Sequence, residues 1–187
     1  MTGPDKKQMK SAARFYAVQA LFQMEVSGQT ARAVSREFEV HRFGATYEDA
    51  EGTGELAEGD VDHFREIIEK AVNWQAKIDQ MTDRALVAKW PIDRIDPVLR
   101  ALFRAAGAEM VDMVTPPKVA INEYVDVAKA FFPDGKEPKF VNAVLDHMAR
   151  EARPDAFMAA CRPAPVPARA ARPAWAPAEP VRPARRR

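Results

Sequence analysis

The chain has 187 residues, 47% of them hydrophobic, and a formal net charge of only +1. This length and composition suit one globular domain that buries a core. The single cysteine, Cys161, excludes an internal disulfide and a multi-cysteine metal site. No apolar run approaches the roughly 18 residues of a membrane span, and the polar amino terminus leads into no signal-peptide core, so we expect a soluble, cytoplasmic protein.

The charges are distributed unevenly along the chain. Residues 162–187 contain seven arginines and one glutamate and therefore carry +6, which leaves −5 on residues 1–161. Proline, alanine and arginine dominate this carboxy-terminal segment, which cannot bury enough apolar surface to offset its ordering entropy. We therefore predict a domain over residues 1–161, followed by a disordered basic tail over residues 162–187.

Helical periodicity runs through most of the predicted domain. The first helix is expected from Lys6 to Val26, and Ser27–Gly28 is a typical helix end. A short helix follows over residues 30–38. Residues 41–59 then carry glycines and acids without periodicity, so we predict a long loop there and no strand.

Capping residues mark the starts of helices in the second half of the domain. Asp60 is suited to cap a helical pattern that continues to about residue 90, either as one long helix or as two with a break near Asn73, which we favour. Asp96–Pro97 indicates the start of another helix, which continues to about Val114. Further helices are predicted over residues 115–132, from residue 137 onward, and for a last turn or two over residues 155–161. The predicted fold class is all-α, with about seven helices packed as bundles.

The sequence contains no recognisable catalytic or metal-binding motif. His41, His63 and His147 are scattered and have no second ligand at metal spacing. A glycine-rich phosphate loop, a nucleophile elbow and an H-E-x-x-H zinc motif are all absent from the sequence. We therefore predict no catalytic residue, no metal site and no cofactor, and we do not expect an enzyme.

The first helix carries cations on the same stripe as its apolar residues. The stripe of residues 17–21 continues toward the amino terminus as Arg14, Lys10 and Lys7. A helix that projects past the edge of a bundle would hold these three cations over the rim of a groove. Such a rim suits a phosphate backbone, because each neutralised phosphate releases counterions. The alternative is an ordinary, solvated helix start.

A second candidate contact stands at the start of the last long helix, in "KFVNAVLD" (residues 139–146). The apolar residues from Val141 onward form a core-facing stripe. Lys139 and Phe140 precede them, and two interpretations are open for this pair. They form the first turn of a core helix, or the aromatic ring stacks on a base while the lysine holds a phosphate.

Three segments, taken together, resemble the NusB family of bacterial transcription antitermination factors. They are "AARFYAVQALFQ", "DRIDPVLRALFRAAGAEM" and "PPKVAINEYVDVAKAFF…KFVNAVLD", in this order across residues 12–149. The third segment follows the family pattern P-x-K-V-A-I-N-E, then A-K, then K-F-V-N-G-V-L-D. The resemblance implies an all-helical fold of two small bundles set across one another.

The resemblance also implies partners. Proteins of this family pair with NusE, a small-subunit ribosomal protein, bind the boxA element of nascent ribosomal RNA, and join an RNA polymerase complex that resists termination. Carried over by position, the family's RNA contacts fall on Lys10, Arg14, Lys139 and Phe140, and the stripe described above adds Lys7. A homodimer that hides the RNA surface is a further possibility.

The family's NusE-facing region corresponds loosely to the helix that contains Arg100 and Arg104. The chain departs from the family pattern at "KKQMKSAAR", where many members have several arginines. The acidic residue that often precedes K-F in the family corresponds either to Asp134 or to Glu137. The rival interpretations are a helical protein-interaction module that binds no RNA and a fragment of a ribosomal RNA methyltransferase, although the chain lacks methyltransferase motifs.

Overall fold

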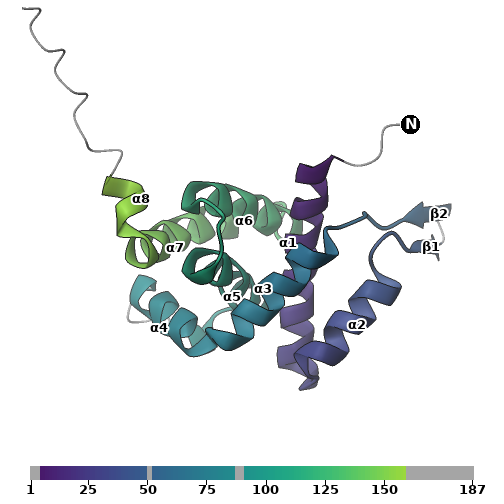
Figure 1. The fold of residues 1–187 in the computed structure, drawn as a ribbon, viewed down its shortest axis with the longest axis horizontal. Helices are drawn as coiled ribbons and strands as arrows, with labels where there is room; N and C mark the ends of the chain where they lie inside the picture. Colours follow the sequence, from purple (N-terminus) through teal and green to yellow (C-terminus); the bar gives the residue numbers. More distant parts are fainter. Residues whose placement is uncertain (1–4, 50–51, 87–90, 159–187) are drawn as a thin grey trace, which may run out of the picture.

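The computed structural model describes residues 5–49, 52–86 and 91–158, and they form an all-α fold with one short β-hairpin (Figure 1). The predicted fold class is therefore confirmed. Cys161 and the predicted tail lie outside the described residues. The elements are α1 (Lys6–Ser27), α2 (Ala31–His41), β1 (Thr46–Asp49), β2 (Gly52–Glu55), α3 (Val61–Asn73), α4 (Gln75–Ala85), the 3₁₀ turn η1 (Ile92–Arg94), α5 (Pro97–Asp112), α6 (Pro117–Phe131), α7 (Glu137–Ala152) and α8 (Pro154–Met158).

The helices form two small bundles, as the resemblance implied. Helices α1, α2 and α3 pack together, with the hairpin beside them, and α4 to α8 form the second group (Figure 1). Helix α5 is the common element, because it packs against α1 and α3 of the first group and against α4, α6 and α7 of the second. Residues 99, 101–103 and 105–110 of α5 are all buried, so the core of the molecule follows this helix.

Local capping chemistry sets several of the predicted boundaries. Gly28 ends α1 with φ of 69°, a left-handed conformation that glycine adopts without steric cost. The carboxylate of Asp60 accepts a hydrogen bond from the backbone N–H of His63 at 3.0 Å, and that of Asp96 accepts one from Val98 at 2.7 Å. The favoured break near Asn73 is also confirmed, because α3 ends at this residue and α4 begins at Gln75.

The prediction of a loop without strands over residues 41–59 is wrong. Strands β1 and β2 pair antiparallel, with Thr46 opposite Glu55 and Asp49 opposite Gly52. This segment is rich in glycine and acids and lacks the alternating apolar residues by which a half-buried strand is recognised. The strands therefore form where the sequence carries no strand pattern.

Helices α4 and α5 approach each other closely at Gly107. A Cβ atom at this position would lie 2.4 Å from Cγ2 of Ile78, well inside van der Waals contact. The absence of a side chain at Gly107 thus allows α4 to pack against the core helix. None of the helices within the described residues is long and apolar enough to cross a membrane.

Candidate nucleic-acid interface

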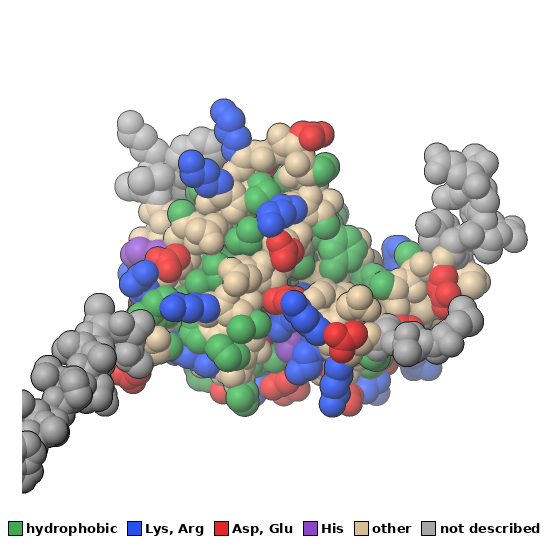
Figure 2. Space-filling view, turned by 90° about the horizontal axis from the view of Figure 1, so that it is seen from above, with side chains coloured by type: hydrophobic (Ala, Val, Ile, Leu, Met, Phe, Trp, Pro, Cys, Tyr) green, Lys and Arg blue, Asp and Glu red, His purple; other side chains and the backbone are tan. Residues whose placement is uncertain are grey.

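The first turns of α1 present lysines to solvent. Lys7 and Lys10 are exposed, and neither makes an ion pair within the described part of the chain. Both line a hollow of about 580 Å³ between α1, α3 and the turn from α5 to α6, which we call the α1 hollow. Figure 2 looks onto the end of the molecule from which α1 begins, where cationic, acidic and apolar side chains are interspersed.

Arg14, one turn further along α1, is not the exposed cation that its position on the stripe predicts. Only 4% of the residue is accessible to solvent. Its Nε and Nη2 atoms donate to the two carboxylate oxygens of Glu109, at 2.7 and 3.0 Å, and Nη1 donates to Glu123 at 3.3 Å. The structure therefore corrects the expectation that Arg14 stands over a solvent-facing rim, because a carboxylate on α5 draws its guanidinium into the core.

Glu109 is the fully buried acceptor of this cluster. Besides the two bonds from Arg14, it accepts a hydrogen bond from the hydroxyl of Tyr124 at 3.0 Å, and Nε2 of His63 lies 3.5 Å from Oε1. We call Arg14, His63, Glu109, Glu123 and Tyr124 the buried charge centre. It joins α1, α3, α5 and α6, and so it connects the two bundles.

The ionisation of the buried charge centre follows from these contacts. Burial raises the pKa of Glu109, but the interactions with His63 and Arg14 outweigh burial and lower it to about 2. Burial likewise lowers the pKa of Arg14, yet pairing with Glu109 raises it above its ordinary value. The pKa of Tyr124 is raised because its hydroxyl is buried beside a carboxylate. Glu109 and Arg14 are thus held as a desolvated ion pair.

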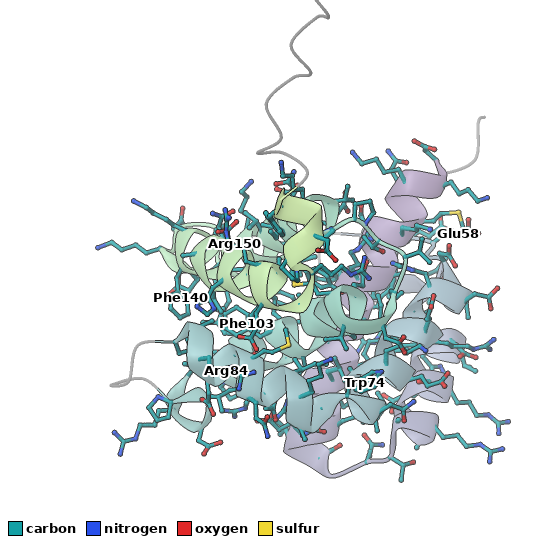
Figure 3. All side chains as sticks on the ribbon, turned by 60° about the vertical axis from the view of Figure 1, so that its left-hand side comes forward. Glu58, Trp74, Arg84, Phe103, Phe140 and Arg150 are labelled. Atoms are coloured by element: carbon teal, nitrogen blue, oxygen red, sulfur yellow. The ribbon has the colours of Figure 1, made fainter. Side chains whose placement is uncertain are left out.

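The second predicted contact lies at the start of α7. Lys139 is exposed, and Phe140 is half-buried with its ring edge-to-face against Phe103, at 6.1 Å between centroids and 71° between planes (Figure 3). One side of the Phe140 ring therefore packs on the core helix α5. Both interpretations of the pair stay open, because a half-buried ring keeps a surface toward solvent.

The two predicted RNA contacts do not form one continuous rim. In Figure 3, Phe140 lies on the opposite side of the molecule from the first turns of α1. The two contacts are therefore separate surfaces, because the start of α7 packs against α5, away from the start of α1. Of the two candidates for the family's loop acid, Asp134 is exposed and Glu137 is half-buried at the first residue of α7.

Arg100 and Arg104 on α5 are held by carboxylates of the same chain. Arg100 pairs with Glu25 and also donates to the carbonyl of Ile92 at 2.8 Å. Arg104 bonds to both oxygens of Asp79, each at 2.9 Å, and to Glu25 at 2.8 Å. These ion pairs tie α5 to the end of α1 and to α4. A protein partner at this surface would have to share them.

Sequence reasoning missed the acidic half of the buried charge centre. The available signal was Glu109 itself, an acid inside "ALFRAAGAEM", where the residues around it are apolar or small. An ionised carboxylate on a buried helix face requires a cation, and Arg14 on the apolar stripe of α1 supplies it. Within the described ranges, no group of three or more His, Cys, Asp or Glu side chains is arranged to hold a metal ion.

Comparison with known proteins connects these features to a family. Residues 11–150 match the NusB family. The transcription antitermination protein NusB of Maricaulis maris is 45% identical over 154 residues, which cover 82% of this chain and 93% of that protein. The protein of the same name from Caulobacter vibrioides is 46% identical over 147 residues, which cover 78% and 95% of the two chains.

Solved structures share the fold. NusB of T. maritima superposes with a TM-score of 0.60 and is 26% identical, over 84% of this chain and 99% of that one. A chain from the crystal structure of antitermination factors NusB and NusE in complex with dsRNA superposes with a TM-score of 0.57, over 75% of this chain and 96% of that one. At 23% identity, the second likeness concerns the fold alone.

Proposed function

Because the chain belongs to the NusB family of transcription antitermination proteins, which are not enzymes, we propose that it binds a boxA-type leader of nascent ribosomal RNA together with NusE. NusE is a small-subunit ribosomal protein, and the proposed pair joins an RNA polymerase complex in the cytoplasm. Support for these partners comes from the structural relative that contains NusB, NusE and dsRNA.

The observation that carries the RNA proposal is the pair of unpaired lysines at the start of α1. Lys7 and Lys10 are exposed and make no ion pair with the described residues, so they are available to neutralise phosphates without first breaking an internal contact. Arg14, whose guanidinium is held by Glu109 and Glu123, takes the role of anchoring α1 so that these lysines keep their places.

The exposed side of Phe140 and the ammonium of Lys139 form the second proposed RNA contact. Stacking on an aromatic ring needs a base that is free of its helical stack, so this contact suits single-stranded RNA. Since Phe140 and the start of α1 lie on opposite sides of the molecule, one RNA reaches both only as an extended strand that follows the surface. The NusE contact is proposed at Arg100 and Arg104 on α5.

A gel-shift titration with a boxA-containing RNA, with and without NusE, tests this proposal. Replacing both lysines, Lys7→Ala with Lys10→Ala, should weaken binding and reduce the slope of log K against log salt by up to ~1.4, because each contact to a single strand contributes ~0.7. Arg32→Ala with Arg36→Ala is the matched control, since it removes two exposed cations from α2.

Two outcomes would contradict the proposal. No shift with the RNA, in the presence or absence of NusE, would favour a helical protein-interaction module that binds no RNA. Binding that disappears when the chain is cut after residue 161 would place the RNA contact on the basic tail and not on α1 or α7.

A further inference from the structure

The α1 hollow has an apolar wall that the RNA proposal does not use. Val114, in the turn between α5 and α6, is 96% exposed, and Val119, in the first turns of α6, is 45% exposed. Both line the hollow together with Pro116 and Met113. Exposed valines that lie together on the wall of a concave surface gain free energy when a ligand covers them.

The opposite side of the hollow is cationic. Lys6, Lys7 and Lys10 line it, and none of the three makes an ion pair with the described residues. The acids of the hollow are Glu66 on α3 and Glu123 on α6, and the carboxylate of Glu123 is already bonded to Arg14 and to the hydroxyl of Ser11. The lysines are therefore the groups in this hollow that are free to meet an anion.

A buried polar group without a hydrogen bond lies in the lining. His63 is only 6% exposed, and its Nε2 atom makes no hydrogen bond within the described structure, although Glu109 lies 3.5 Å away. Buried ring nitrogens ordinarily have a partner. Because this nitrogen is closed off from solvent beside Glu109, His63 lines the hollow without offering Nε2 to a ligand.

An apolar wall and a cationic side are together complementary to a nucleotide. A nucleobase has an apolar face and a hydrogen-bonding edge, and it is flanked in a strand by two phosphates. The volume of about 580 Å³ lies within the range of small-ligand sites, which is roughly 300–1,000 Å³. A base that is stacked within a duplex cannot enter such a hollow, whereas an unstacked base can.

We infer that the α1 hollow holds one unstacked nucleotide of the bound RNA. Its base lies against Val114 and Val119, and its neighbouring phosphates contact the lysines at the start of α1. This inference rests on the proposed RNA function and adds a base-reading site to it, separate from Phe140.

The test is a double-mutant cycle between the protein and the RNA. Full-length chain is titrated, with NusE present, against boxA-containing RNAs in which each nucleotide in turn is replaced by an abasic one. For the unaltered chain, the abasic substitution at one RNA position should lower the affinity ~5-fold or more, because the base that occupies this hollow is missing. Such a factor is typical of a lost base contact. The variant Val114→Ser with Val119→Ser should bind intact RNA more weakly by a similar factor. Its affinity should fall no further when the RNA is abasic at that position.

The matched control is Val40→Ser with Val72→Ser. These valines are 62% and 42% exposed and lie on α2 and α3, so the control removes comparable apolar surface away from the wall of the hollow. It should bind intact RNA as the unaltered chain does. Thermal unfolding of both variants shows whether either one has lost its fold.

The possible results separate this inference from the RNA proposal. If the affinity losses of the Val114–Val119 variant and of the abasic RNAs multiply at every RNA position, no base touches the valines and the inference is overturned. In that case, a reduced salt slope for the lysine variant would still support RNA binding at α1. If the lysine variant binds with an unchanged slope, the RNA contact at α1 fails, and the inference fails with it. If the valine variant weakens NusE binding in the absence of RNA, the hollow is a protein contact and the inference is overturned.

Discussion

Two regions of α1 lie one turn apart on the same stripe and carry the same charge, but they differ in exposure to solvent and in ion pairing. Lys7 and Lys10 are exposed and unpaired within the described structure, whereas Arg14 is buried and hydrogen-bonded to carboxylates of α5 and α6. The comparison shows that cations which continue an apolar stripe can serve recognition or stability. The deciding factor is whether a carboxylate from another helix faces them.

The energetic consequences of the two regions should be opposite. An exposed lysine interacts with water and dissolved salt, so its removal costs little stability. Arg14 and Glu109 have lost their water, and each depends on the other to remain charged inside the core. Changes at the buried charge centre should therefore alter the unfolding free energy, while changes at the lysines should alter binding.

The largest effect is expected for Glu109→Ala. The substitution leaves the Arg14 guanidinium buried without its main partner, which should lower the free energy of unfolding by about 3–5 kcal/mol. Urea unfolding followed by circular dichroism measures this loss. Glu39→Ala is the control, because Glu39 pairs with Arg65 at the surface, and its effect should be far smaller. Equal losses for the two variants would contradict the expected cost of leaving Arg14 buried without its main partner.

A pH dependence of nearly the same size is expected from Glu109. Its pKa is lowered from 4.5 to about 2 on folding, so the unfolded chain takes up a proton first as the pH falls. The contribution of Glu109 to the free energy of unfolding is therefore fully present above pH 4.5 and is lost as the pH falls toward 2. At ~1.4 kcal/mol for each pKa unit, it amounts to about 3 kcal/mol.

Comparison with Glu109→Gln isolates this contribution. The other acids with lowered pKa values, Glu25, Glu39, Asp112 and Glu151, are present in both proteins and cancel in the difference. The stability advantage of the unaltered chain should shrink between pH 4.5 and the lowest pH at which it stays folded. Parallel pH curves for the two proteins would refute the lowered pKa of Glu109.

A smaller effect is expected for Tyr124→Phe, which removes the hydroxyl that donates to Glu109 at 3.0 Å. A hydrogen bond to a buried charge contributes about 1.5–3 kcal/mol, so the variant should lose stability in this range. Tyr16→Phe is the matched control, because its hydroxyl donates to the uncharged carbonyl of Ala57 at 2.8 Å. The loss of stability for Tyr16→Phe should be about 0.5–1.5 kcal/mol. A loss larger than that of Tyr124→Phe would contradict the expected difference between the two hydroxyls.

The smallest change in stability is expected for Lys7→Ala with Lys10→Ala. Surface substitutions away from special features usually change the unfolding free energy by less than about 0.5 kcal/mol. The urea midpoint of this variant should match that of the unaltered chain, while its affinity for boxA-containing RNA falls. A stability loss above about 1 kcal/mol would mean that the lysines support the fold and would remove the contrast with Arg14.

The sequence predicts those features that depend on neighbouring residues. Asp60, Asp96 and Gly28 mark helix ends because each caps the backbone within a few residues of itself. The family resemblance supplies the two-bundle arrangement, which local signals alone do not specify. Elements whose boundaries rest on a cap or a helix-stop signal therefore agree with the structure.

The features that were missed depend on residues far apart in the chain. Arg14 and Glu109 are 95 positions apart, so no periodicity along α1 reveals that a carboxylate will meet the arginine. Phe140 is placed in the same way by Phe103, on a different helix. Strands β1 and β2 are held together by backbone pairing, which needs no apolar pattern in the side chains.

The buried charge centre affects whether the two halves of the chain can be separated or exchanged. Four helices contribute to it, two from each bundle, and its charges are compatible with burial only when all four are assembled. A half-chain cut at Trp74 would keep Arg14 without Glu109, or Glu109 without Arg14. Each half would thus carry one charge of a buried pair without the other, and we expect recombination that exchanges one half between distant homologues to succeed only if both members of this ion pair are inherited together.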